Sequence, residues 1–185
     1  MESSLKFFRQ LALITALGLC ATHAFADGQD SAQIDFTGTI KIPGCTITEQ
    51  TVPVKMGDIP ISAFGGPNTK ATPQPFKVSM TCPAGINNLT YQLNPSGTSQ
   101  VVGDMSQGIV SLTSNSGASG IGVELMDDKG APIPLKQDNP VSAYDPKTPN
   151  QQNITMNFQA AYIQTDANVK GGEADAQATF TLSYQ

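Results

Sequence analysis

The feature that most constrains this chain is an alternation of apolar and polar side chains with a period of two. In "PFKVSMTC" (75–82) every second residue from Phe76 is apolar or cysteine, and the residues between them are polar. No stretch carries the apolar stripe of an amphipathic helix, so an all-β chain is predicted. Comparable runs occupy 34–42, 89–93, 121–126, 153–164 and 173–185.

Turn-forming segments separate these runs. Glycine and proline there supply bends and positive φ at low steric cost. Short, half-buried strands between such turns are typical of an antiparallel β-sandwich. In "MDDKGAPIPL" a hairpin is expected, with one arm ending at Met126 and the other beginning near Ala131. The remaining turn segments are 64–68, 94–97, 114–120, 145–150 and 170–172.

The N-terminus has the pattern of an export signal. A basic start with Lys6 and Arg9 precedes the apolar run 11–21, and "AFA" (24–26) fits a cleavage site, so a cut after Ala26 is predicted. The run is short for a membrane span, and none follows it, so no direct membrane insertion is expected. A lipoprotein signal ending at Cys20 is the alternative, although Leu19 stands where a small residue is needed.

Removing residues 1–26 leaves 185 − 26 = 159 residues, the size of one domain. The balance becomes 8 Lys against 14 acidic residues, a net charge of −6, with no Arg, His or Trp. An acidic chain without arginine is a poor nucleic-acid binder. It also lacks the basic patch that would draw it to anionic lipid.

Two cysteines remain, Cys45 and Cys82, and in an exported chain they are expected to form a disulfide. Two unpaired buried thiols are the alternative. The crosslink would close a loop of about 38 residues and stabilise the fold by ~4 kcal/mol on the chain-entropy model.

The residue types of common enzymes are missing from the expected mature chain. Without histidine or a free cysteine there is no usual nucleophile–base pair and no zinc ligand set, so no catalytic residue, metal or cofactor is predicted. Asp127 and Asp128 are the only candidate calcium ligands considered. Because they are adjacent, their carboxylates would not converge on one ion, and a solvated turn explains them better. The sequons at Asn88 and Asn153 are explained by β-favouring threonines.

Strands at the two ends of the chain therefore become the candidates for function. The early alternating run follows a polar lead, 27–33, and can be either the first strand of its own sheet or a strand that pairs elsewhere. The late run, 174–184, ends the chain without a Lys or Pro that would blunt an edge, so it is a template for strand addition. The apolar positions of the early run are Ile34, Phe36, Gly38, Ile40 and Ile42.

Together these segments resemble pilin subunits of the chaperone–usher pathway, which build surface fimbriae of Gram-negative bacteria. The resemblance covers the whole expected mature chain and includes a glycine about fourteen residues from the C-terminus and a penultimate tyrosine. The size and the ending "ATFTLSYQ" look most like minor, adaptor-type subunits. The residues that match the family are Ile34, Phe36, Gly38 and Ile40 of its N-terminal extension, its cysteine pair Cys45 and Cys82, and Gly172 and Tyr184 of its C-terminal motif.

The resemblance implies an incomplete immunoglobulin-like sandwich, residues 41–185, that lacks its last strand. A periplasmic chaperone would fill the resulting acceptor groove first, and the extension of the next pilin, residues 27–40, would replace it during export through an outer-membrane usher to the cell surface. Two alternatives remain for single residues of this run. Ile42 can belong to the chain's own first strand, and Gly38 can be a bulge or a close approach within the chain's own sheet. The expected groove residues are Ala178, Phe180, Leu182 and Tyr184.

The predicted function is that of a non-enzymatic structural subunit, which polymerises head-to-tail by donor-strand exchange and supports bacterial adhesion. One alternative is a carbohydrate-binding adhesin, which the absence of Trp disfavours because sugar faces favour aromatic stacking. Another is an exported enzyme or inhibitor on a sandwich scaffold.

Overall fold

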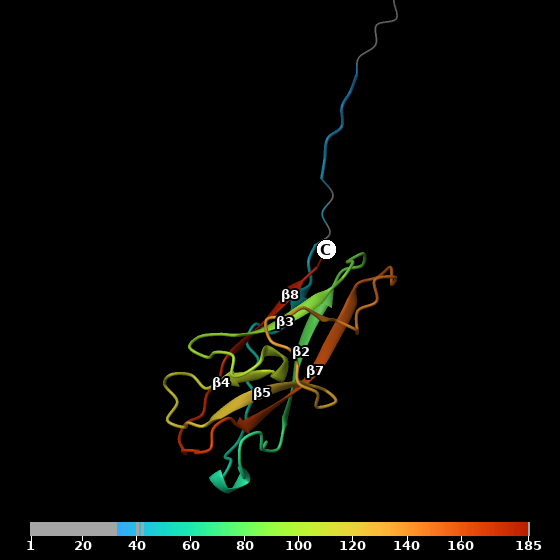
Figure 1. Cartoon of the computed structure of the whole chain (residues 1–185). Helices are drawn as coiled ribbons and strands as arrows, with labels where there is room; N and C mark the ends of the chain where they lie inside the picture. The colour runs from blue at the N-terminus through green and yellow to red at the C-terminus, as the bar shows by residue number, and fades with distance from the viewer. Residues whose placement is uncertain (1–32, 40, 42, 185) are drawn as a thin grey trace, which may run out of the picture. The chain divides into compact units, whose positions relative to one another are not determined.

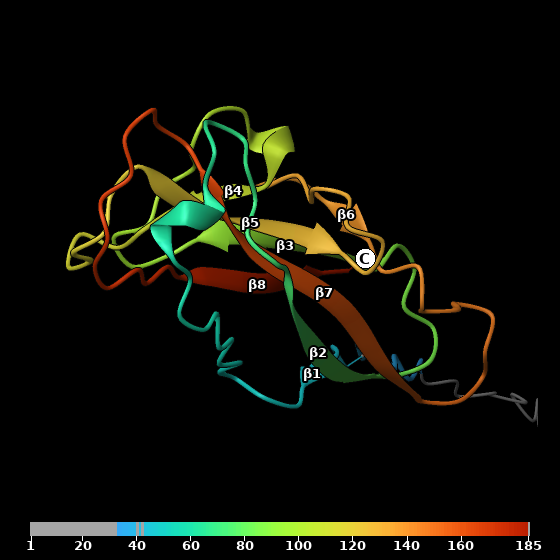
Figure 2. The same ribbon diagram turned by 90° about the horizontal axis from the view of Figure 1, so that it is seen from below.

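A computed structural model describes residues 33–39, 41 and 43–184 of the chain (Figure 1). The predicted signal peptide, Ile40 and Ile42 lie outside the described residues. Residues 33–39 contain no strand or helix and are described by themselves. Residues 43–184 form a two-sheet β-sandwich, in which β2 and β7 belong to one layer and β3 and β8 to the other (Figure 2).

All strand pairs of the sandwich are antiparallel. One sheet has the order β1-β2-β7-β5-β4, and the other has the order β6-β3-β8. The described helices are two short 3-10 turns, η1 (Ile61–Ala63) and η2 (Met105–Gln107), and no described helix is long and apolar enough to span a membrane. The strands are β1 (Thr46–Ile47), β2 (Gln74–Cys82), β3 (Thr90–Pro95), β4 (Ile109–Ser111), β5 (Ile121–Asp127), β6 (Asn139–Pro140), β7 (Gln152–Gln164) and β8 (Ala178–Ser183).

The core lies between the two sheets and is formed by the inward positions of the alternating strands. In β2, Val78, Met80 and Cys82 are buried, whereas Lys77 is exposed. An aromatic cluster bridges the layers, with Tyr91 stacked on Phe180 at 5.2 Å between ring centroids. Phe158 meets Phe180 edge-on at 6.2 Å between ring centroids and stacks on Phe76 at 5.3 Å. Such pairs add about 0.5–1.5 kcal/mol each to the burial of their rings.

A charged residue is buried within β5. Glu124 alternates with the core residues Val123 and Leu125, and it is only 3% exposed. Its Oε2 lies 2.6 Å from Nζ of Lys70, and the two side chains form an ion pair. A buried carboxylate without a cation would cost several kcal/mol, so Lys70 stabilises this strand by neutralising it.

The sequence predicted these strands well at the centre of the sheets. β2, β3, β5 and β7 confirm the alternating runs. The expected turn after Met126 is also present: the amide of Asp127 donates to the carbonyl of Ala131, and the amide of Gly130 donates to the carbonyl of Asp127. The Asp127 carboxylate accepts the amides of Lys129 and Ala131 at 2.9 and 2.8 Å, which explains its place in the turn.

Two of the expected strands differ in the structure. The early run has no strand among its described residues, because β structure requires a hydrogen-bonded partner and none is present for 33–39. The late run becomes a strand only at Ala178, because the residues before it form backbone hydrogen bonds with the loop at 113–118 instead of with a neighbouring strand. Thr113 donates its amide to the carbonyl of Asp175 at 2.7 Å, and Ala118 donates to Glu173 at 3.0 Å.

The predicted disulfide is present and joins Cys45, just ahead of β1, to Cys82 at the end of β2. The paired strand residues Thr46 and Thr81 lie directly beside it. The crosslink therefore ties the beginning of the sandwich to the end of β2, the second strand of the larger sheet.

Candidate strand-binding groove

The last strand, β8, is an edge strand with one free side. Among the described residues it pairs only with β3, with Leu93 opposite Phe180 and Tyr91 opposite Leu182. Ser96 donates its amide to the carbonyl of Gln177 at 3.0 Å, which identifies the odd-numbered residues as those facing β3. In an antiparallel strand the alternate residues direct both backbone groups the other way. The even-numbered residues of β8 therefore present N–H and C=O groups to the free edge.

Opposite β8 lies a second wall, made by the chain that follows β1. Thr48 donates its amide to the carbonyl of Ser79 at 2.8 Å, but no hydrogen bond is found for the described residues 49–59. Their burial nevertheless alternates, with Val52, Val54 and Met56 half-buried against the core. This wall has the side-chain pattern of a strand without a backbone partner.

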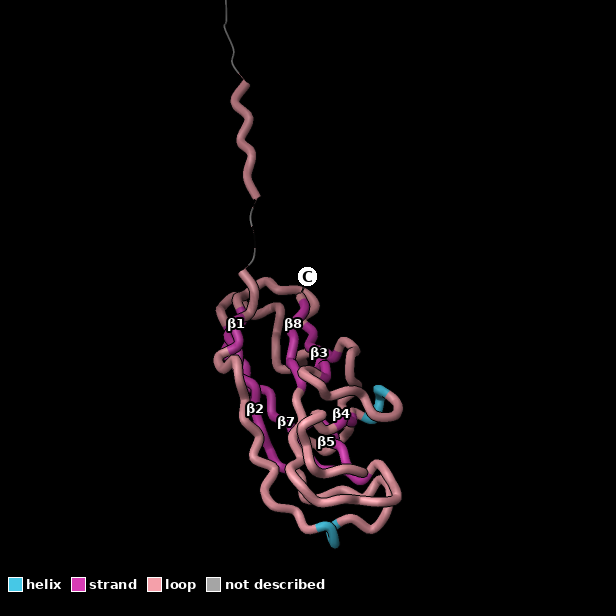
Figure 3. The backbone as a smooth tube through the Cα atoms, turned by 90° about the vertical axis from the view of Figure 1, so that its left-hand side faces the viewer, coloured by secondary structure: helices cyan, strands magenta, loops and turns pink. Residues whose placement is uncertain are grey.

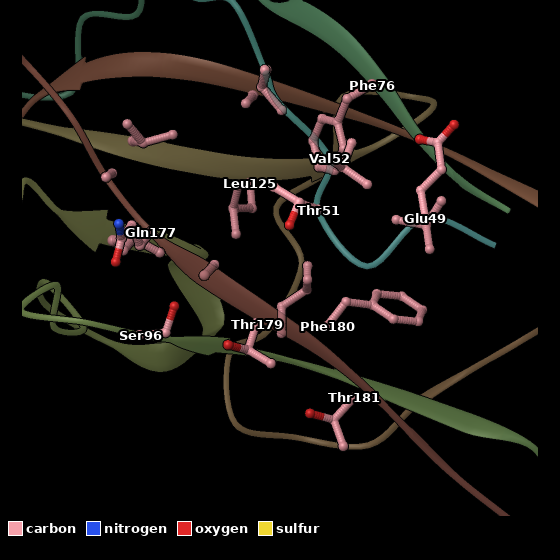
Figure 4. A pocket seen from close by; sticks show the side chains of 18 of the residues that line it. Glu49, Thr51, Val52, Phe76, Ser96, Leu125, Gln177, Thr179, Phe180 and Thr181 are labelled. Carbon is pink, nitrogen blue, oxygen red and sulfur yellow. The ribbon is translucent and has the colours of Figure 1, made fainter. Parts of the chain in front are cut away.

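A groove of about 1080 Å³ separates the two walls. Figure 4 shows Glu49, Thr51 and Val52 on one wall and Phe180 on the other. The floor of the groove, between the two walls, is formed by side chains of the hydrophobic core. The floor residues are Phe76, Val78, Leu93, Val110, Val123, Leu125, Ala160 and Tyr162.

The groove has two different ends. At one end Tyr184 lies against Gly44, since a Cβ added to Gly44 would overlap the tyrosine hydroxyl. At the other end the hydroxyl of Tyr162 donates to the carbonyl of Ala174 at 2.6 Å. Beyond it, Gly172 has a φ of +155°, and a Cβ there would come within 2.5 Å of the carbonyl carbon of Gly117. This close backbone approach explains why a glycine is needed near the C-terminus.

The charged residues on the groove walls are acidic. Glu49 and Asp175 line the groove, and none of its lining residues is Lys. Burial raises the pKa of the Tyr162 hydroxyl above its usual value, and the nearby charge of Asp175 raises this pKa further. The Tyr162 hydroxyl therefore keeps its proton, which it needs to donate to Ala174.

This arrangement predicts an alkaline sensitivity of the fold. Because the folded pKa of Tyr162 is raised, its contribution to stability is complete below the unfolded pKa of about 10 and is lost as the pH rises through the folded pKa. We expect Tyr162→Phe to lose about 1 kcal/mol at pH 8 and to weaken the decline of stability above pH 10. Urea unfolding from pH 8 to 11, of a fusion that carries a second copy of residues 27–40 after the C-terminus, measures both effects. Identical pH profiles of the two proteins would contradict the assignment.

The structure places the predicted acceptor residues Ala178, Phe180, Leu182 and Tyr184 together along the groove. In the separately described extension, Ile34 is 72% and Phe36 92% exposed, and Gly38 has open space around its Cα. Ile40 lies outside the described residues.

Sequence reasoning missed the second wall. The alternation in "TVPVKM" (51–56) was the signal that could have found it, since Val52, Val54 and Met56 are its half-buried positions.

The geometry of the groove suits the binding of one extended segment. It offers an apolar floor and an unpaired strand edge, which are the two features that bind a β-strand by addition. Within the described residues no cluster of side chains could hold a metal ion.

Comparison with known proteins assigns this geometry to a family. The family model described as "Fimbrial protein" matches residues 34–185. A type-1 fimbrial protein subunit of Serratia marcescens is 31% identical over 93% of this chain and 96% of its own length. A probable major fimbrial subunit of Escherichia coli O157:H7, LpfA, is 27% identical over 93% and 94%.

Solved structures agree on the fold. A type I fimbria protein of Burkholderia pseudomallei is 27% identical, with a TM-score of 0.50, over 82% of this chain and 96% of its own. The P pilus rod subunit PapA, at 15% identity, has a TM-score of 0.55 over 83% and 100%. The molecule is thus a pilin-type β-sandwich with an immunoglobulin-like fold. The chain belongs to the fimbrial protein family, and it is a structural subunit of a surface pilus that assembles with other pilin subunits.

Proposed function

We propose that this subunit polymerises head-to-tail by donor-strand exchange in a chaperone–usher fimbria that supports bacterial adhesion. In this proposal residues 27–40 are the donated extension and residues 41–185 the accepting sandwich. The observation that supports it is the groove beside β8, where a free strand edge stands over an open core.

The extension has the chemistry that the groove requires. Ile34, Phe36 and Ile40 alternate with polar residues, so in an extended conformation they share one face. Burying these side chains contributes about 1.5–3 kcal/mol each, or roughly 5–9 kcal/mol together before ordering costs. Gly38 would sit at a shallow point of the groove, where a side chain would collide.

Backbone pairing adds to this side-chain burial. The even-numbered residues of β8 and the unbonded wall 49–59 would both find hydrogen-bond partners in an inserted strand. Groove and extension are different surfaces of one subunit. Each new contact therefore leaves a free groove at one end of the assembly and a free extension at the other, so that the assembly grows as a filament.

The same open groove explains the proposed partners. A free subunit would expose its core, so a periplasmic chaperone is proposed to lend a strand until an outer-membrane usher brings the next extension. The exchange replaces one strand by another and requires no cofactor and no catalytic residue.

The test is to supply the strand in cis. We expect a copy of residues 27–40, joined to the C-terminus by a short flexible linker, to give a stable monomer that unfolds cooperatively. The same fusion carrying Phe36→Asp in the copy is the control and should remain unstable. A stable, cooperative monomer of the unfused mature chain would overturn the proposal.

The adhesin alternative is separated by a second measurement on the same fusion protein. A glycan array probed with it should show no binding if the subunit is structural. Specific binding of a sugar would favour the carbohydrate-binding function.

A further inference from the structure

We propose that Pro73, Pro75 and Lys77 are specificity-determining residues, which keep a second free strand edge from accepting an extended segment and so direct that segment to β8. This inference depends on the proposed strand exchange. The three residues, called here the edge-blocking residues, belong to the stretch "TPQPFK" (72–77) at the beginning of β2. The segment that they turn away from β2 is residues 27–40 of a second copy of this chain.

The second free edge belongs to β2. β7 pairs with all of β2 on one side, whereas on the other side β1 pairs only with Met80 and Thr81. Figure 3 shows β1 beside one end of β2, which continues well beyond it. The amide of Thr48 still donates to the carbonyl of Ser79, but among the described residues no backbone hydrogen bond from that side reaches 74–78. This stretch is therefore a strand edge without a partner.

The free edge of β2 borders the same groove as β8. Phe76 and Val78 from this stretch line the groove, as does Phe180 of β8. An extended segment that enters the groove therefore comes near two free edges, one from each sheet. Pairing with β2 would add a strand to the larger sheet and leave β8 without a partner. Productive exchange thus requires a difference between the two edges.

Pro75 and Lys77 direct their backbone groups toward the free edge of β2. Because Ser79 accepts the amide of Thr48, the odd-numbered residues of β2 face the β1 side and the even-numbered residues face β7. Pro75 has no N–H, which a strand tolerates where the nitrogen faces an edge. Lys77 is exposed, and the ion pair found among the described residues does not involve it. A strand added here would lose one donor and would approach an unmatched charge.

A β-bulge at Pro73 extends this protection. The ladder has Lys70 opposite Ile163 and then Gln74 opposite Ala160, so one residue more lies between these pairs on this side than on β7. Such an extra residue bends the strand and increases its twist. Bulges, prolines and lysines are the means by which natural sheets protect their edges against strand addition. All three occur together at the beginning of β2.

β8 carries none of these features. Its sequence "ATFTLS" (178–183) contains neither Pro nor Lys, and it pairs with β3 in continuous register without a bulge. Ala178, Phe180 and Leu182 therefore each present an N–H and a C=O to the free edge. An incoming segment can form a complete ladder with β8 and only an interrupted one with β2.

The test uses the fusion that carries a copy of residues 27–40 after its C-terminus, to which free peptide 27–40 is added in excess. Hydrogen exchange is measured at single backbone amides. In the wild-type fusion the amides of Phe180 and Leu182 should be protected without peptide, and the peptide should leave exchange at Lys77 unchanged. In Pro75→Thr with Lys77→Thr, which supplies polar residues that favour β structure, we expect the peptide to slow exchange at residue 77 about tenfold or more.

Two further variants make the result specific. Pro146→Thr with Lys147→Thr removes the same residue types from an exposed turn and should behave like the wild type. Lys77→Thr alone retains the proline, and should show a smaller slowing even if the double variant does not fold. The same response of residue 77 to peptide in the wild type and in the edge variants would overturn the proposal. Unprotected amides at Phe180 and Leu182 in the wild-type fusion would overturn strand exchange, and this inference with it.

Discussion

Phe36→Asp is expected to abolish donation of this subunit's extension to a neighbour without affecting the subunit's ability to accept a strand. The substitution removes about 1.5–3 kcal/mol of ring burial and adds the cost of placing a carboxylate in an apolar groove. Together these terms predict a loss of at least a thousandfold in the affinity of the extension for a neighbouring groove. The test mixes the variant and wild-type subunits, each in complex with the proposed periplasmic chaperone, and measures the length of the polymers formed.

The neighbouring variant Thr37→Asp provides the control, because residue 37 lies on the opposite face of an extended segment. It should assemble almost as well as the wild type. The Phe36→Asp subunit should still accept a wild-type extension and so terminate chains at one end. If both variants polymerise equally, the extension does not bind through its Ile34–Phe36 face.

Removal of the disulfide is expected to have the largest effect on stability. Cys45→Ala with Cys82→Ala opens a loop with a sequence separation of 37 residues, which corresponds to ~4 kcal/mol on the chain-entropy model. Cys45 also lines the groove, at the start of a wall that has no hydrogen bonds of its own from 49 to 59. Without the tether, that wall should detach, and the variant should bind a donor peptide more weakly.

Chemical unfolding of the strand-completed fusion with and without reductant measures this contribution. The double variant should match the reduced wild type, and reductant should leave the double variant unchanged. Since both proteins differ from the oxidised wild type only in the crosslink, equal stability of all three would show that the disulfide does not support the sandwich.

Much of the fold could be predicted because its information is local. An alternation such as Phe76, Val78, Met80 identifies a strand and its buried face, and the structure confirms this in β2, β3, β5 and β7. The pairing of Cys45 with Cys82 was predictable because only two cysteines follow the expected signal peptide and export was expected. The alternation also predicted the strand that contains Ala178, Phe180 and Leu182, and the resemblance to pilins implied a groove beside it; in the structure these residues line one groove.

The sequence by itself thus determined an all-β chain, the inward faces of its strands and an edge strand at the end of the chain. Only the tertiary structure decided that residues 49–59 form the second wall of the groove, and that Glu124 is buried beside Lys70. The physical reason is that alternation specifies which face of a strand is buried, whereas its neighbours along the hydrogen-bonding direction are set by residues far away in the chain.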